Sequence, residues 1–169
     1  MNNKYHLLVV DGNPYVSGIL VQTLRTHFNV TVANTGQEAV RLLIQGNRFD
    51  CVLTELNLPL IGGLELTNFI RTNRLLKHTP VVVLSNASDS DTRIECLEQG
   101  VDSYIAKPFN PLEVRAKLLA LLRRTALAVE ETPYSPVSVR QQPEAKPVHQ
   151  LKSRLLSMIM KPYAALQRT

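Results

Sequence analysis

The sequence predicts an α/β fold, in which a five-stranded parallel sheet carries helices on both of its faces. Short apolar segments and longer helical patterns alternate in strict order five times within the first 124 residues. Strands that are joined through helices pair in parallel, with right-handed crossovers. Most of the apolar segments are continuous runs, which is typical of strands covered on both faces.

The first two strand and helix units have clear start and stop signals. A strand over residues 5–10 leads to a helix over 14–27, because Asn13 suits an N-cap and Pro14 suits the first helical position. A second strand over 30–33 leads to a helix that ends at Gly46, and Thr35 with Glu38 forms a capping box at its start.

The remaining three units follow the same pattern. A strand over 50–54 precedes a helix over 63–74, and an almost entirely β-branched strand over 80–84 precedes a helix over 89–99 that Gly100 closes. The last strand covers 103–106. Asn110, Pro111 and Glu113 then repeat the cap, proline and capping-box pattern before a Leu-rich helix that runs to about Arg124.

The composition changes after Arg124, and three parts are expected: a domain over 5–124, a Pro-rich flexible linker over 125–150 and a short tail over 151–169. The linker segment holds four prolines and many polar residues without a sustained period. In the tail, apolar side chains recur at helical spacing among basic residues, which predicts a short basic amphipathic helix; they are Leu151, Leu155, Met158 and Ile159.

The net charge of +5 belongs mainly to the C-terminal part of the chain. Residues 1–123 hold 12 Lys and Arg against 11 Asp and Glu, whereas residues 124–169 hold 7 against 3. The tail leaves room for about one helix and a helix-turn-helix module needs three, so DNA binding by this chain is not expected. No apolar run reaches membrane-spanning length and no signal-peptide pattern is present, so we expect a cytoplasmic protein and no membrane partner.

Side chains with useful chemistry stand at the ends of four of the expected strands: Asp11, Glu55, Ser85 and Lys107. In open α/β sheets, ligands bind outside the carboxyl ends of the strands, so we expect these side chains to meet at one edge. Lysine and serine can contact phosphate oxygens, and carboxylates can hold Mg²⁺. The sequence therefore predicts an anion or phosphoryl site.

Several stretches, in the right order, resemble the receiver domain of two-component response regulators over residues 5–124. They are Leu7-Leu8-Val9-Val10-Asp11, Leu56-Asn57-Leu58-Pro59, Gly63-Leu64-Glu65, Val83-Leu84-Ser85, Gly100-Val101-Asp102-Ser103-Tyr104 and Lys107-Pro108-Phe109. The resemblance implies the flavodoxin-like strand order 2-1-3-4-5 and a role in phosphorelay signal transduction.

The resemblance also implies a role for each matching position. In that family an aspartate at the position of Glu55 accepts a phosphoryl group from a histidine kinase, aided by Mg²⁺ that two acids after the first strand hold. The residues at Ser85 and Lys107 contact the phosphoryl oxygens, and an aromatic residue at Tyr104 acts as a switch. The face of the fourth helix, fifth strand and fifth helix contacts the output partner, and the sequence leaves a homodimer open.

Two positions depart from that pattern, because Gly12 replaces the second metal-binding acid and Glu55 replaces the acceptor aspartate. With Asp11 alone, Mg²⁺ binding should be weakened, so no resident cofactor is expected. The longer glutamate places its oxygen roughly 1.5 Å from where in-line transfer needs it. We therefore interpret the domain as a phosphorylation-independent, non-enzymatic signalling module, with Glu55 a partial mimic of the phosphorylated state.

Other interpretations stay open from the sequence alone. The chain could be a conventional phosphoaccepting response regulator, or a flavodoxin-like enzyme that binds a flavin or nucleotide. Against the enzyme, the turn after the first strand is Asp-Gly-Asn-Pro and lacks a phosphate cradle. At the level of single residues, Glu55 could be an idle solvated carboxylate, Asp11 a helix cap, Lys107 only a salt-bridge partner, Ser85 a turn hydroxyl and Tyr104 a packing residue.

Overall fold

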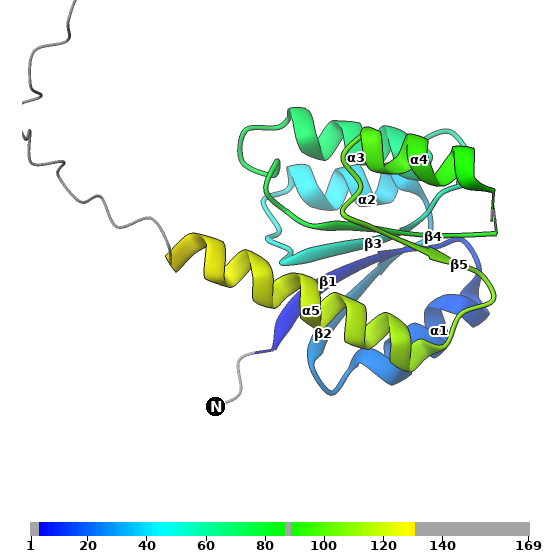
Figure 1. The fold of residues 1–169 in the computed structure, drawn as a ribbon, viewed down its shortest axis with the longest axis horizontal. Helices are drawn as coiled ribbons and strands as arrows, with labels where there is room; N and C mark the ends of the chain where they lie inside the picture. Colours follow the sequence, from blue (N-terminus) through cyan, green and yellow to red (C-terminus); the bar gives the residue numbers. More distant parts are fainter. Residues whose placement is uncertain (1–3, 87–88, 131–169) are drawn as a thin grey trace, which may run out of the picture. The chain divides into compact units, whose positions relative to one another are not determined.

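The computed structural model describes residues 4–86 and 89–130 of the 169-residue chain. Five strands and five helices alternate in this part, as the sequence predicts (Figure 1). In chain order they are β1 (Tyr5–Val10), α1 (Pro14–Leu24), β2 (Phe28–Ala33), α2 (Gly36–Ile44), β3 (Cys51–Glu55), α3 (Gly63–Thr72), β4 (Val81–Ser85), α4 (Ser90–Glu98), β5 (Ser103–Ala106) and α5 (Pro111–Glu130).

The five strands form one parallel sheet with the order β2-β1-β3-β4-β5, which confirms the expected topology. In Figure 1, α1 and α5 lie on one side of the sheet, and α2, α3 and α4 lie on the other. The inner strands β1, β3 and β4 are therefore covered on both faces, which explains their continuous apolar runs.

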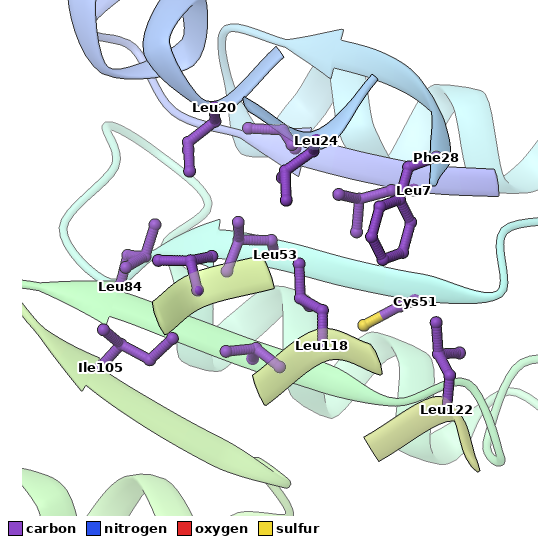
Figure 2. Close-up of a cluster of buried hydrophobic side chains, with 13 residues drawn as sticks. Leu7, Leu20, Leu24, Phe28, Cys51, Leu53, Leu84, Ile105, Leu118 and Leu122 are labelled. Atoms are coloured by element: carbon purple, nitrogen blue, oxygen red, sulfur yellow. The ribbon is translucent and has the colours of Figure 1, made fainter. Parts of the chain in front are cut away.

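Alternate side chains of β1 enter two separate cores, one on each face of the sheet. Leu7 and Val9 of β1 pack in one core with residues of α1 and α5, whereas Leu8 and Val10 pack in the other with residues of α2 and α3. Figure 2 shows the first core, where strand side chains meet Leu20 of α1 and its neighbours. Each such fully buried aliphatic side chain contributes about 1.5–3 kcal/mol through its removal from water.

The expected caps at Asn13 and Thr35 and the expected closing glycines Gly46 and Gly100 are present. The Asn13 side chain accepts hydrogen bonds from the first turn of α1, and the Thr35 hydroxyl accepts one from the Glu38 amide. Gly46 and Gly100 adopt φ values of +85° and +93° after α2 and α4, the left-handed conformation that closes a helix.

Several element boundaries differ from the expectation, and the largest difference is at the end of α5. Helix α5 runs to Glu130, six residues past the predicted end at Arg124 and into the expected linker. Residues 125–130 contain neither Pro nor Gly and are rich in Ala, which has the highest helix propensity, so the helix continues. The rest of the expected linker, and the expected tail helix over 151–169, lie outside the described residues.

The other differences are shorter. Helix α1 ends at Leu24 instead of residue 27, and β2 begins at Phe28 instead of residue 30, because Phe28 is buried in the core and pairs with Tyr5 of β1. Helix α3 ends at Thr72 because Asn73 is extended. Within 4–86 and 89–130, no helix has the length and apolar character to cross a membrane.

Candidate functional site

The carboxyl ends of the strands bring three of the expected site residues together. Asp11 directly follows β1, Glu55 is the last residue of β3, and Lys107 directly follows β5. The three residues line one pocket of about 270 Å³, together with residues of the neighbouring loops: Gly12, Asn13, Asn57, Leu58, Pro59 and Asn86. Three of the four strand-end side chains that the sequence analysis expects to meet therefore lie together at one edge of the sheet, and the fourth, Ser85, does not line the pocket.

Lys107 binds both carboxylates at once. Its ammonium nitrogen Nζ donates to Asp11 Oδ2 at 3.0 Å and also to Glu55 Oε2. The two acids are almost completely buried, with 3% of Asp11 and 8% of Glu55 exposed to solvent. A single cation thus neutralises part of the charge of two buried anions.

Backbone amides hold the other oxygen of each acid. Glu55 Oε1 accepts from the amides of Leu56 at 2.9 Å and Asn57 at 3.3 Å, and Asp11 Oδ1 accepts from the Asn13 amide at 2.8 Å. All four carboxylate oxygens are therefore engaged. These amide donors were not identified from the sequence, because their direction depends on the path of the loops.

The pair of carboxylates sets the charge state of Lys107. Burial alone would lower the pKa of its ammonium group, but the hydrogen bonds and charges of Glu55 and Asp11 outweigh burial and hold that pKa above its ordinary value. Lys107 therefore stays a cation throughout the physiological pH range.

Ser85 lies beside the pocket without lining it. It is the last residue of β4 and is fully buried, and its carbonyl oxygen accepts from the Lys107 amide at 2.8 Å. This backbone contact fixes the chain at the point where Lys107 leaves β5. The Lys107-Pro108 peptide bond that follows is cis.

Tyr104 lies apart from the pocket, in β5. Its side chain is buried in a small cluster with Val83 of β4, Cys96 of α4 and Val101. The guanidinium carbon of Arg93 in α4 lies 5.7 Å from the centre of the Tyr104 ring, within the range of a cation–π contact. The sequence does not predict this contact of Arg93, because a helical pattern does not indicate which residue an exposed arginine contacts.

Close backbone contacts fix the loop between β3 and α3. A Cβ atom at Gly63 would lie 2.7 Å from the Glu55 carbonyl oxygen, and one at Gly36 would lie 2.0 Å from the Ile61 carbonyl oxygen. Leu60 at the tip adopts a positive φ of 67°. Because Gly36 and Gly63 at these two helix starts have no side chain, the loop can pass close to the site. In this loop path the Leu56 and Asn57 amides point at Glu55.

The donor set does not fit a divalent cation. Mg²⁺ needs carboxylate oxygens within a near-octahedral shell, but the four oxygens here already accept hydrogen bonds and two of them contact an ammonium group. Within residues 4–86 and 89–130, no group of three or more His, Cys, Asp or Glu side chains is arranged to hold a metal ion. Gly12 supplies no further oxygen from its side chain.

The pocket also argues against a flavin or nucleotide site. Its volume of about 270 Å³ lies just below the usual range for small-molecule pockets. The turn after β1 donates an amide to Asp11 instead of forming a phosphate cradle.

Comparison with known proteins gives a consistent result. The family model for the response regulator receiver domain matches residues 7–119. The transcriptional regulatory protein SrrA of Staphylococcus aureus is 36% identical over 126 residues, which cover 74% of this chain and 50% of SrrA. The chain thus spans about half the length of this curated relative.

Solved structures of receiver proteins superpose on the same part of the chain. The Francisella response regulator 1452 receiver domain is 28% identical, with a TM-score of 0.66 over 72% of this chain and 99% of that domain. The chemotaxis response regulator CheY4 of Vibrio cholerae is 27% identical, with a TM-score of 0.62 over 73% of this chain and 99% of CheY4.

Proposed function

The chain belongs to the response regulator receiver domain family, and from that premise we propose that it is a receiver that signals by protein contact without phosphorylation. The family places the chain in two-component signalling. The proposal goes further, in that the pocket at the carboxyl ends of the strands neither accepts a phosphoryl group nor catalyses a reaction.

The observation that carries the proposal is the contact between Glu55 and Lys107. Glu55 occupies the strand-end position where the family has its acceptor aspartate, and Lys107 is the lysine that would contact a phosphoryl group. Glu55 Oε2 supplies Lys107 with the negative charge that such a group would bring. The second carboxylate oxygen is held by two backbone amides, which keeps Glu55 from turning toward an incoming donor.

We propose the face of α4, β5 and α5 as the output surface. Ile94 and Leu97 of α4 are both about half exposed, at 51% and 53%, and Arg93 on the same helix contacts Tyr104. Apolar side chains at helical spacing next to the Tyr104 cluster suit a protein partner. That partner is a histidine kinase or another signalling protein, or a second copy of this chain, and the complex forms in the cytoplasm.

Incubation with acetyl phosphate and Mg²⁺, followed by intact-mass measurement and peptide mapping, tests the proposal. The unmodified chain should gain no phosphoryl group. Glu55→Asp alone should also stay unlabelled, whereas Glu55→Asp combined with Gly12→Asp should be labelled, because the pair restores both the acceptor and the missing acid. Labelling of Glu55 in the unmodified chain would overturn the proposal.

A conventional phosphoaccepting response regulator is the second candidate. It is favoured by the position of Lys107, which reaches the end of β3 from the end of β5 as a phosphate-binding lysine would. The same measurement separates the two functions, since only the conventional receiver takes up the phosphoryl group.

A further inference from the structure

A second pocket lies at the opposite edge of the sheet from the site described above, near the amino ends of the strands. It measures about 450 Å³, within the usual range for ligand pockets, and residues of β1, β2, α2 and the loop between α2 and β3 line it. Leu42 of α2 and Phe49 of the loop give it an apolar wall, and the loop and β1 add the polar residues Arg48, Asp50 and His6. It shares no lining residue with the pocket at the carboxyl ends of the strands.

Hydrogen bonds hold this second pocket in shape. The Asp50 amide donates to the His6 carbonyl oxygen at 2.8 Å, and the His6 amide donates to Asp50 Oδ2 at 2.7 Å, so two contacts fix the loop to β1. Asn47 Nδ2 donates to the Leu42 carbonyl oxygen at 2.8 Å, which ties the same loop to α2. Phe49 is partly buried and packs against the core that α2 and α3 cover. The pocket is therefore formed before any ligand binds.

Basic side chains gather beside this pocket. The loop between α2 and β3 (residues 45–50) and the loop between α3 and β4 (residues 73–80) enter adjacent strands, and both lie at the left end of the sheet in Figure 1. Together the two loops form an amino-edge surface that exposes Arg48, Arg74 and Lys77. Their single acid already accepts a hydrogen bond from a backbone amide. The amino-edge surface thus carries excess positive charge, although residues 1–123 hold nearly equal numbers of basic and acidic residues.

Two exposed aliphatic side chains lie among these charges. Leu75 is 91% exposed between Arg74 and Lys77, and Ile44, at the end of α2 just before the first loop, is 68% exposed. Apolar side chains next to basic ones suit a protein segment that carries both acidic and apolar side chains. A nucleic acid would use the positive charges but would leave these apolar side chains and the apolar wall of the pocket unused.

We propose that the amino-edge surface and its pocket form a docking site for an acidic peptide segment of a partner protein. A large apolar side chain of that segment enters the pocket against Leu42 and Phe49. Acidic residues on either side of it pair with Arg48, Arg74 and Lys77. The site shares no residue with the output surface of α4, β5 and α5, and the inference does not depend on the proposed absence of phosphorylation.

A peptide that contains tryptophan is a suitable probe, because this chain has no tryptophan of its own. The probe carries six aspartate and glutamate residues around one central tryptophan. The full chain is titrated into it at low ionic strength, where charge pairs are least screened, and the tryptophan fluorescence is followed. The native chain should give a saturable change. Competing peptides that lack either the tryptophan or the acidic groups should displace the probe at least about tenfold less well.

The chain itself supplies matched variants. The test variant removes the three positive charges of the amino-edge surface: Arg48→Gln, Arg74→Gln and Lys77→Gln. The control variant removes the same charge from exposed positions of α5: Lys117→Gln, Arg123→Gln and Arg124→Gln. The test variant should bind the probe at least about tenfold more weakly than the native chain does, whereas the affinity of the control variant should stay within about twofold of the native value.

Three results would overturn the inference. They are no binding of the probe by the native chain, equal loss of binding in the two variants, and equal competition by the acidic peptide that lacks tryptophan. Binding of duplex DNA or of phosphatidylserine vesicles without binding of the probe would also overturn it. The acetyl phosphate experiment is independent, because it tests the proposed function without involving the amino-edge surface.

Discussion

Lys107 and Glu55 are joined across the sheet, from the end of β5 to the end of β3, with β4 lying between these two strands. The same ammonium group reaches further to Asp11 after β1. One side chain thus ties the carboxyl end of β5 to the carboxyl ends of β3 and β1, neither of which is a neighbour of β5 in the sheet.

Removal of this cation should destabilise the fold. In Lys107→Met, two buried carboxylates lose their shared partner, and breaking a buried ion pair from one side costs about 3 kcal/mol or more. Urea denaturation followed by circular dichroism measures the change in the free energy of unfolding. Lys117→Met removes a surface pair and should change that free energy by at most about 0.5 kcal/mol. Equal losses in the two variants would contradict a buried, structural ion pair.

The stability of the protein should fall at high pH through the same lysine. Because the pKa of Lys107 is raised in the folded state, the folded chain binds more protons than the unfolded chain once the pH passes the unfolded value near 10.4. The contribution of Lys107 is therefore complete below that pH and is lost as the pH rises through the higher folded pKa.

The measurement for this prediction is the difference in unfolding free energy between the native chain and Lys107→Met as a function of pH. We expect a constant difference up to about pH 10 and a smaller one above it. A difference that grows with pH would mean that Lys107 has a lowered pKa in the fold.

Gly36→Ala should destabilise the β3–α3 loop. The new methyl group would lie 2.0 Å from the Ile61 carbonyl oxygen, so the loop must move, at a cost of about 1–3 kcal/mol. Gly18→Ala is the matched control, because Gly18 lies in α1 and a methyl group there would meet no atom within 4 Å. Alanine favours helix over glycine, so this control should gain up to about 1 kcal/mol. Thermal denaturation separates the two, and a stabilised Gly36→Ala would refute the close contact.

Arg71 should be needed for the stability of the sheet at the edge opposite the Lys107 pocket. Its guanidinium group donates to the carbonyl oxygens of Gly100, Lys77 and Thr79 and to the Asp102 carboxylate. Lysine cannot reproduce this planar set of donors, so Arg71→Lys should lose about 2 kcal/mol of unfolding free energy. Arg74→Lys, at an exposed position nearby, should leave it within about 0.5 kcal/mol. Chemical denaturation of the two variants tests the contrast.

Much of the fold could be predicted because local signals agreed with the global pattern. The Asn13 and Thr35 caps, the closing glycines Gly46 and Gly100 and the buried strand runs each mark an element that the structure contains. The order of the strands came from the resemblance and not from the periodicity. The expected end of α5 at Arg124 lies too early, because the prolines that follow indicate a linker, whereas the Ala-rich segment before them extends the helix to Glu130.

The candidate site was predictable only at the level of which residues meet. Strand ends in a parallel sheet identify Asp11, Glu55 and Lys107. The amides that hold Glu55, the contact of Gly36 with Ile61 and the position of Arg93 over Tyr104 depend on loop paths and side-chain conformations. No local pattern in the sequence specifies these, and they require the assembled fold.

The contact that a Cβ atom at Gly12 would make has a consequence for how this site changes by mutation. A Cβ atom at Gly12 would lie 3.4 Å from the Asn34 carbonyl oxygen, an ordinary van der Waals contact. Under the genetic code, one base change converts a suitable glycine codon to aspartate, and one converts a glutamate codon to aspartate. Two such steps would give the pocket the set of acids that the resemblance implies for the family. Under the function proposed here, two single-base changes would therefore suffice to restore phosphoryl chemistry.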